Sequence, residues 1–452
     1  MNREHDSEAD DVERRGSLLV LACLAPIVGA LSGLVGGFFR LSLEYADAWR
    51  DAAIALARDW AQGQEYLGLL IVAGACGVAV AVAAGLVRRF APPASGSGIP
   101  HVEAVMRGEL SPAPLSLIPV KFVGGFLAIG SGLALGREGP SVQMGAGVGH
   151  LIGLAFRCPW PIYRVLIAAG AGAGLATAFN APIAGAIFVL EELVRRFEVG
   201  IAIAALGASA AAIAVARLIL GDMPDFAVQT FTMPGHLADP LFFALGAVAG
   251  LLAVVYNRTL LATLALARWL GRVPVELRAG VIGAAVGALA WFAPDLVGGG
   301  DPLTQRALEG SELLAVLPML FVLRLALGAV SYAAGTPGGL FAPMLVLGAE
   351  LGLAFGLVCA FAFPDLGVPP TAFAVVGMAA FFTGVVRAPL TGIVLVTEMT
   401  ASVTLLLPIL VACFAAMLVP ALLRDVAIYD ALRERLFERS LTPSRSSRSR
   451  RD

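Results

Sequence analysis

Long segments without a single charged side chain recur along this sequence, and any fold it adopts has to bury them or place them in lipid. Residues 17–39, 165–190, 240–257, 325–349, 366–386 and 399–423 contain no Asp, Glu, Lys or Arg. About 20 apolar residues in a helix cross the roughly 30 Å hydrocarbon core of a bilayer. Charged residues make up 14% of the chain, against roughly 25% in soluble domains. The sequence therefore predicts a polytopic membrane protein in a lipid bilayer and excludes a large soluble catalytic domain.

Shorter apolar segments between isolated charges indicate that some helices stop inside the membrane. The uncharged residues 388–397, for example, are too few to cross it. Interrupted helices are tolerated at this depth only where they are buried in protein or line a cavity. We expect an all-α polytopic membrane protein with about ten or more spanning segments and several broken or re-entrant half-helices.

Both ends of the chain are polar. Residues 1–16 read as a polar N-terminal tail, and the apolar segment after them lacks the basic leader of a secretory signal, so it is predicted to be the first spanning helix. Residues 425–452 are predicted to form a C-terminal helix with an Arg/Ser-rich tail, since eight arginines lie from Arg424 to Arg451. Because cytoplasmic loops are enriched in Lys and Arg, we expect both termini in the cytoplasm and the protein in the inner cell membrane.

The chain also repeats itself. Shifts of 203 and 207 positions align residues of the first half with residues of the same kind in the second half, including eight pairs of glycines. The most informative pairs are Lys121 with Arg324, Pro140 with Pro343, Pro182 with Pro389, and Glu191 with Glu398. We predict a first membrane repeat over residues 17–220 and a second over 221–424. Such halves in transporters are often inverted, with the substrate held near the midplane by interrupted helices.

Two equivalent motifs read as helix starts. Residues 136–140 (GREGP) precede one apolar stretch and residues 339–343 (GLFAP) precede its repeat counterpart. Proline is tolerated in the first turn of a helix because its missing N–H has no partner there anyway. A helix start presents free N–H groups and a partial positive charge, which together favour an anion. Two starts that converge would make a midplane anion site, whereas two ordinary Gly/Pro turns would explain the same residues.

A third motif, residues 96–100 (GSGIP), supplies the Ser97 hydroxyl between two glycines. On its own it is equally well explained as a simple turn. Taken with GREGP at 136–140, GGLFAP at 338–343, the EEL of Glu191 to Leu193 and the late Tyr429, in that order, it resembles the CLC family of chloride channels and chloride/proton antiporters. The resemblance covers nearly the whole chain, from about residue 17 to 435, and is closest to prokaryotic members without cytoplasmic regulatory domains.

The resemblance implies a homodimer with one anion pathway in each subunit. The hydroxyls of Ser97 and Tyr429 and the backbone N–H groups of Leu340 and Phe341 would bind chloride. Glu138 would be the external gating glutamate. Glu192 would be the internal proton-transfer glutamate of the antiporters. No metal or other cofactor is implied.

The residues themselves give Glu138 a physical role. An ionised carboxylate in the bilayer is costly, but beside a helix N-terminus it is stabilised as any anion would be. The carboxylate could therefore occupy the anion site, and its protonation would release that site to chloride. An ion pair with Arg137 is the structural alternative.

The sequence also suggests roles for several other polar residues, and for two of them an alternative role remains open. Glu192 lacks an acidic repeat counterpart, since Met399 takes that place, which suits a function on one side only; a capping or surface role is the alternative. Tyr429 is either an anion ligand or an interfacial anchor. Glu191 and Glu398 are expected to be structural. Lys121, the only lysine, is expected to form a structural salt bridge, for which Glu103 is a plausible partner.

Chloride/proton exchange is thus the expected function, and a passive voltage- or pH-gated chloride channel is the nearest alternative. A remote alternative is an intramembrane aspartyl protease, because Asp301 ends a GGGD sequence and Tyr429-Asp430 forms a YD pair. The reversed order of these motifs argues against it. A net charge of −2 gives no reason to expect a nucleic acid partner.

Overall fold

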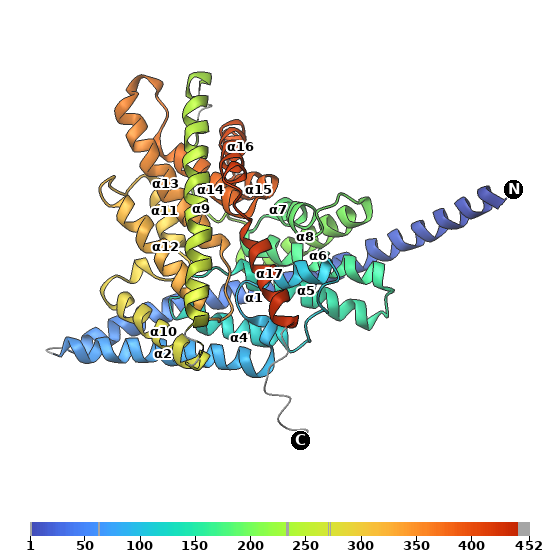
Figure 1. The fold of residues 1–452 in the computed structure, drawn as a ribbon, viewed down its shortest axis with the longest axis horizontal. Helices are drawn as coiled ribbons and strands as arrows, with labels where there is room; N and C mark the ends of the chain where they lie inside the picture. Colours follow the sequence, from blue (N-terminus) through green and yellow to red (C-terminus); the bar gives the residue numbers. More distant parts are fainter. Residues whose placement is uncertain (1, 62–63, 232–234, 270, 272, 442–452) are drawn as a thin grey trace.

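The computed structural model describes residues 2–61, 64–231, 235–269, 271 and 273–441, and in these residues the regular structure is helical throughout (Figure 1). The first half contains eight α-helices: α1 (Asn2–Trp60), α2 (Glu65–Phe90), α3 (Ile99–Met106), α4 (Leu117–Gly130), α5 (Glu138–Ala155), α6 (Trp160–Phe179), α7 (Pro182–Phe188) and α8 (Val199–Leu220). A π-helical turn, η2 (Val189–Leu193), extends α7. The all-α prediction is confirmed.

The second half repeats this order of elements. It contains α9 (Asp239–Trp269), α10 (Val275–Phe292), α11 (Asp301–Glu309), α12 (Leu317–Ala333), α13 (Phe341–Ala362), α14 (Pro370–Val386), α15 (Pro389–Thr400) and α16 (Leu406–Leu422). One further helix, α17 (Ile428–Leu441), follows and packs against α3. The Arg/Ser-rich residues 442–452 lie outside the described residues.

Helix length separates spanning from interrupted segments. Within the described ranges, seven helices are long and apolar enough to cross a membrane, and five further apolar helices have only 10–17 residues. Fewer than the expected ten therefore reach spanning length by themselves. Two of the short helices, α7 and α15, contact each other instead.

The same helix contacts occur in both halves. In the first, α5 packs on α6 so closely that an added Cβ on Gly145 would lie 2.1 Å from the Gly170 carbonyl oxygen. In the second, α13 packs on α14, and an added Cβ on Gly348 would lie 2.5 Å from the Gly377 carbonyl oxygen. These four glycines are two of the pairs that the sequence repeat aligns. Close backbone approach at both places explains why glycine recurs there.

One contact between equivalent helices suits the predicted inversion of the two halves. The N-terminal ends of α5 and α13, which are equivalent in the repeat, meet at one point where Glu138 contacts Phe341. Helices that start from a shared point run away from it in different directions, which suits halves of opposite orientation.

The paired glutamates Glu191 and Glu398 also connect the two halves. Glu398 on α15 accepts hydrogen bonds from the first amides of α7, and Glu191 in η2 accepts hydrogen bonds from the first amides of α15. Each glutamate thus caps a helix of the other half, as expected for a structural role.

The N-terminal residues differ from the prediction. Residues 2–16, read as a polar tail, belong to the same continuous helix as the apolar segment after them. No proline occurs before Pro26, and residues 2–16 include three Glu and three Arg, residue types that favour helix. Figure 1 shows this end of α1 projecting from the body of the molecule.

Candidate anion site

Three glycine-rich loops are joined by backbone hydrogen bonds at the centre of the bundle. The Gly96 N–H donates to the Thr336 carbonyl (3.0 Å), and the Gly338 N–H donates to the Gly96 carbonyl (3.2 Å). Gly136 and Gly339 exchange two hydrogen bonds of 2.9 and 2.7 Å. The fold therefore brings together the three motifs that were singled out in the sequence.

Glu138 begins α5 and is completely buried. Its Oε1 accepts a hydrogen bond of 2.6 Å from the Phe341 N–H at the start of α13, while its Oε2 has no hydrogen-bond partner. The alternative partner Arg137 instead binds Asp225 at 3.1 Å and Asp301 at 3.3 Å. The structure thus places the Glu138 carboxylate on a helix N-terminus and not in an ion pair with its neighbour.

Two side-chain hydroxyl groups, those of Ser97 and Tyr429, also belong to the candidate site. Ser97 and Tyr429 are both fully buried and interact with each other, yet neither hydroxyl has a hydrogen-bond partner at ordinary distance and angle. Buried polar groups normally have partners, so this pair leaves hydrogen-bonding capacity for a small ligand. The full burial of Tyr429 is inconsistent with an interfacial anchor.

Aromatic packing fixes the α13 start. Leu340 and Phe341 are fully buried, and the Phe341 ring packs against Phe179, Phe188, Phe382 and Tyr429, with ring centroids 4.7–6.1 Å apart. The predicted residues Ser97, Glu138, Leu340, Phe341 and Tyr429 are therefore gathered in one buried place.

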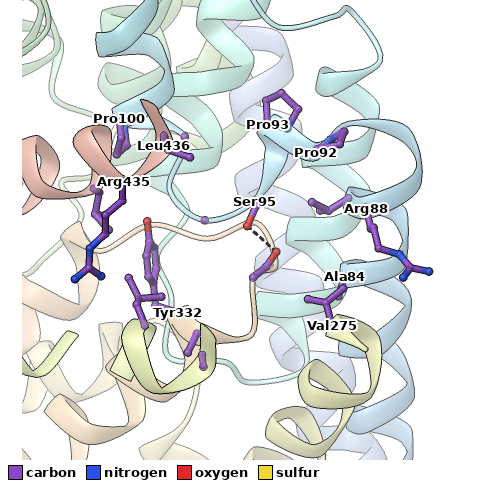
Figure 2. A pocket seen from close by; sticks show the side chains of 18 of the residues that line it. Ala84, Arg88, Pro92, Pro93, Ser95, Pro100, Val275, Tyr332, Arg435 and Leu436 are labelled. Atoms are coloured by element: carbon purple, nitrogen blue, oxygen red, sulfur yellow. Dashed lines mark hydrogen bonds between the residues drawn. The ribbon is translucent and has the colours of Figure 1, made fainter. Parts of the chain in front are cut away.

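A cavity of about 320 Å³ approaches this place from the side of α17. Gly96 and Gly98, on both sides of Ser97, belong to its wall, as does Tyr332, whose hydroxyl accepts a hydrogen bond of 3.3 Å from the Ser97 N–H. Four arginines line it: Arg88, Arg268, Arg278 and Arg435. Figure 2 shows Arg88 and Arg435 on opposite sides of the cavity. Such a wall attracts anions.

A second, much smaller cavity of about 40 Å³ lies against the other loops of the site. Gly136, Arg137 and Ala342, neighbours of Glu138 and Phe341, line it, together with the half-exposed Asp301. The site thus lies between two cavities, with Ser97 beside one and Glu138 beside the other.

Glu192 lies in a separate group of charged side chains. It is 2% exposed, in η2, and its Oε1 is 3.4 Å from Arg195. Arg195 also contacts Glu103 on α3 (3.4 Å) and Asp430 on α17 (3.1 Å). Asp430, one residue after Tyr429, connects this group to the anion site. The burial of this carboxylate argues against the surface role that was the alternative for Glu192.

Lys121 corrects another prediction. Its Nζ donates to the carbonyl oxygens of Ala94 (3.0 Å) and Gly96 (2.7 Å) and not to Glu103, which binds Arg107 at 2.8 Å. Its repeat counterpart Arg324 binds the carbonyls of the loop before α11 in the same way. Both cations satisfy loop carbonyls that the bundle would otherwise bury without partners.

The two aspartates required by the protease alternative have separate partners. Asp301 binds Arg137 beside the small cavity. Asp430 binds Arg195 and Arg433 on the side of α17. Each is held in an ion pair, and the two line different parts of the molecule.

Sequence reasoning missed Asp225, Tyr256 and Tyr332. Asp225, 2% exposed, joins Arg40 (2.7 Å) to Arg137 (3.1 Å) from the segment between the two halves. Tyr256 and Tyr332 are lone tyrosines in apolar helices. No local motif marks any of the three, because their neighbours come from distant parts of the chain.

Comparisons with known proteins agree with this arrangement. The family described as voltage gated chloride channel matches residues 77–421. The chain is 39% identical over 424 residues, covering 91% of it and 88% of the relative, to the H(+)/Cl(-) exchange transporter ClcA of Vibrio cholerae. The crystal structure of a slow cyanobacterial Cl−/H+ antiporter has a TM-score of 0.87 and 34% identity, covering 93% of this chain and 98% of that one. A CLC-type fluoride/proton antiporter, 23% identical with a TM-score of 0.75, covers 91% of this chain and 97% of its own and shares the fold.

Proposed function

Because the chain belongs to the voltage-gated chloride channel (CLC) family, we propose that it is a secondary active antiporter that exchanges chloride for protons. The observation that carries this proposal is the Glu138 carboxylate on the Phe341 N–H, beside the two unpartnered hydroxyls of Ser97 and Tyr429. Relatives named as H(+)/Cl(-) exchangers support it.

Glu138 couples the two ions by competition. Its ionised carboxylate uses an N–H group that would otherwise bind chloride. Protonation removes the negative charge, weakens that interaction, and frees the helix N-terminus for the halide. Each occupant excludes the other, which is the linkage that exchange requires.

Glu192 serves as the proton-transfer group on the other side. Its buried carboxylate lies beside α17, away from the small cavity next to Glu138. Protons and chloride would then take different routes on the side of the arginine-lined cavity and share a route at Glu138.

Chloride is the proposed anion. Hydroxyl and amide N–H groups from Ser97, Tyr429, Leu340 and Phe341 suit a small anion without a full positive charge, which would hold it too tightly for turnover. Exchange of nitrate or fluoride faster than chloride would contradict this assignment.

The test is a chloride gradient across proteoliposomes, recorded with chloride and pH electrodes together. Chloride leaving the vesicles should drive protons inward against their gradient. E138Q and E192Q should abolish proton movement while chloride still flows. E198Q, at an exposed position six residues from Glu192, is the matched control and should retain coupling. Chloride flux without any uphill proton movement in the wild type would favour the passive channel.

The same vesicles report on pH. Protonation of Glu138 frees the anion site, so chloride turnover should rise as the pH falls. E138Q mimics the protonated state and should lose most of this dependence.

We also propose that the protein is a homodimer in the inner cell membrane with both termini in the cytoplasm. The support is the resemblance to the family and the excess of arginine near the C-terminus.

A further inference from the structure

Charged side chains from three separate parts of the chain form one connected charge cluster beside α17. They come from α3 and the loop after it, from η2 and the residues after it, and from α17. Ion pairs join Glu103, Arg107, Glu109, Glu192, Arg195, Asp430 and Arg433. Among the described residues, the cluster thus has four carboxyl groups and three guanidinium groups. One negative charge is in excess when all of them are ionised, and a single proton on one carboxyl group removes this excess.

Glu192 is the carboxyl group of the cluster that the arginines stabilise least. Glu103 and Asp430 each contact three arginines, and Glu109 has an arginine at 2.6 Å. In the part of the chain that the structure describes, Glu192 contacts Arg195 alone, at 3.4 Å, although its side chain is only 3% exposed. A buried charge with little compensation is costly. The proton that balances the cluster therefore belongs on Glu192.

Arg195 connects Glu192 to the other carboxyl groups. Its Nη2 atom lies 3.4 Å from Glu192, 3.4 Å from Glu103 and 3.1 Å from Asp430. A single nitrogen atom cannot donate well to three carboxylates at once. Ionised Glu192 therefore competes with Asp430 for Arg195, whereas protonated Glu192 leaves this guanidinium group to Asp430 and Glu103.

The backbone of Arg195 also indicates that this placement is enforced. Its φ angle is +54°, in the left-handed region, which costs free energy for a residue with a side chain. Such a conformation persists where the surrounding contacts maintain it. The ion pairs to Glu103, Glu192 and Asp430 are contacts of this kind.

Asp430 carries the effect to the candidate anion site. It directly follows Tyr429 in the first turn of α17. Tyr429 is fully buried, and its ring centroid lies 6.0 Å from that of Phe341, whose N–H donates to Glu138. A firm pair between Arg195 and Asp430 holds this turn of α17 in place. The charge on Glu192 therefore bears on the position of the Tyr429 hydroxyl.

The other titratable groups on the elements around η2 have different surroundings. Besides α3, η2 packs on α6, α7 and α8, and α7 has no charged residue. Glu191 caps α15, and His101 on α3 lines the large cavity. Tyr163 contacts His150, Arg217 contacts Asp222, and Arg164 forms no ion pair within the described ranges. Ionisation of Glu192 thus acts on α17 through Arg195.

We propose that Arg195 is a positioning residue that couples the proton on Glu192 to the chloride ligand Tyr429 through Asp430. This inference rests on the proposed function. With Glu192 protonated, Arg195 holds Asp430, and the Tyr429 hydroxyl stays in place to donate to chloride. With Glu192 ionised, Arg195 is shared and chloride is held less tightly.

Chloride binding to the purified protein, measured by calorimetry from acid to alkaline pH, tests this coupling. The E138Q background removes the carboxylate that competes with chloride. E138Q should bind chloride about fivefold more weakly or less tightly still at alkaline pH, because Glu192 ionises as the pH rises. E138Q/E192Q should bind tightly throughout. E138Q/R195Q should bind weakly throughout, and E138Q/R195K, which keeps the positive charge, should retain the pH dependence.

R196Q is the matched control, because it removes the same charge at the next residue, whose side chain is exposed. In the E138Q background it should leave the pH dependence unchanged. D430N breaks the other end of the connection while Glu192 keeps its contact with Arg195. E138Q/D430N should therefore also lose the pH dependence, and it tests the proposal even if proteins with R195Q do not fold.

Equal chloride affinity of E138Q at acid and alkaline pH would overturn the proposal. A pH dependence that persists in E138Q/E192Q, E138Q/R195Q or E138Q/D430N would overturn it as well, and a uniform loss of affinity with the same pH dependence would leave Arg195 a structural role only. These equilibrium measurements do not depend on ion exchange. Exchange by the wild type together with pH-independent binding by E138Q would refute only the role of Arg195, whereas the proposed function fails if the wild type moves no protons uphill.

Discussion

At the residue scale, Gly139 shows how little space surrounds the proposed anion site. A Cβ on Gly139 would lie 2.6 Å from the Ser97 hydroxyl oxygen and 2.7 Å from the Ser97 carbonyl oxygen. A Cβ on Gly339 would lie 2.1 Å from Oε1 of Glu138. Neither glycine has a positive φ angle. Close packing, and not an unusual backbone conformation, therefore requires glycine at these two positions.

We predict that G139A displaces Ser97 and weakens chloride binding about tenfold or more, because one donor to the anion is lost. Calorimetry measures the affinity. G74A is the control: no atom lies within 4 Å of a Cβ placed on Gly74 in α2, and Ala there should leave binding unchanged and add slightly to stability. Normal chloride affinity in G139A would mean that Ser97 does not bind the anion.

At the scale of elements, the reciprocal caps hold the two halves together. The Glu398 carboxylate accepts from the N–H groups of Ile183 (3.1 Å) and Ala184 (2.8 Å) at the start of α7. The Glu191 carboxylate accepts from Leu390 (3.0 Å) and Thr391 (2.7 Å) at the start of α15. Carboxylates at helix N-termini are stabilising, and here each acts across the repeat boundary.

E398A should therefore lower the free energy of unfolding by about 1–2 kcal/mol, the usual cost of losing a helix cap, and E191A should cost a similar amount. E398Q keeps one acceptor and should cost less. Thermal unfolding of the detergent-purified proteins measures whether their stabilities follow this predicted order. E434A, at an exposed position of α17, is the control. An E398A protein as stable as E434A would show that the exchange of caps adds nothing to the stability of the bundle.

At the scale of the whole molecule, the outer surface is apolar enough for lipid or for a second copy of the chain. On α16, for example, Leu410, Phe414 and Leu422 are 51–72% exposed. We predict that light scattering in mild detergent gives a protein mass about twice the 46.5 kDa of one chain, as expected for closed two-fold assemblies. A monomer mass at all protein concentrations, with transport intact, would rule out an obligate dimer.

The sequence alone determined the membrane environment, the duplication and the positions of the helix starts that carry Ser97, Glu138 and Phe341. Those properties reside in local signals: uncharged segments, Gly/Pro motifs and repeated spacing. Only the tertiary structure decided which groups meet: Lys121 with loop carbonyls, Arg137 with Asp225, and Asn257 with Asp425. These partners are separated by 25 to 168 residues along the chain. A side chain's partner depends on how distant helices pack, which no local pattern encodes.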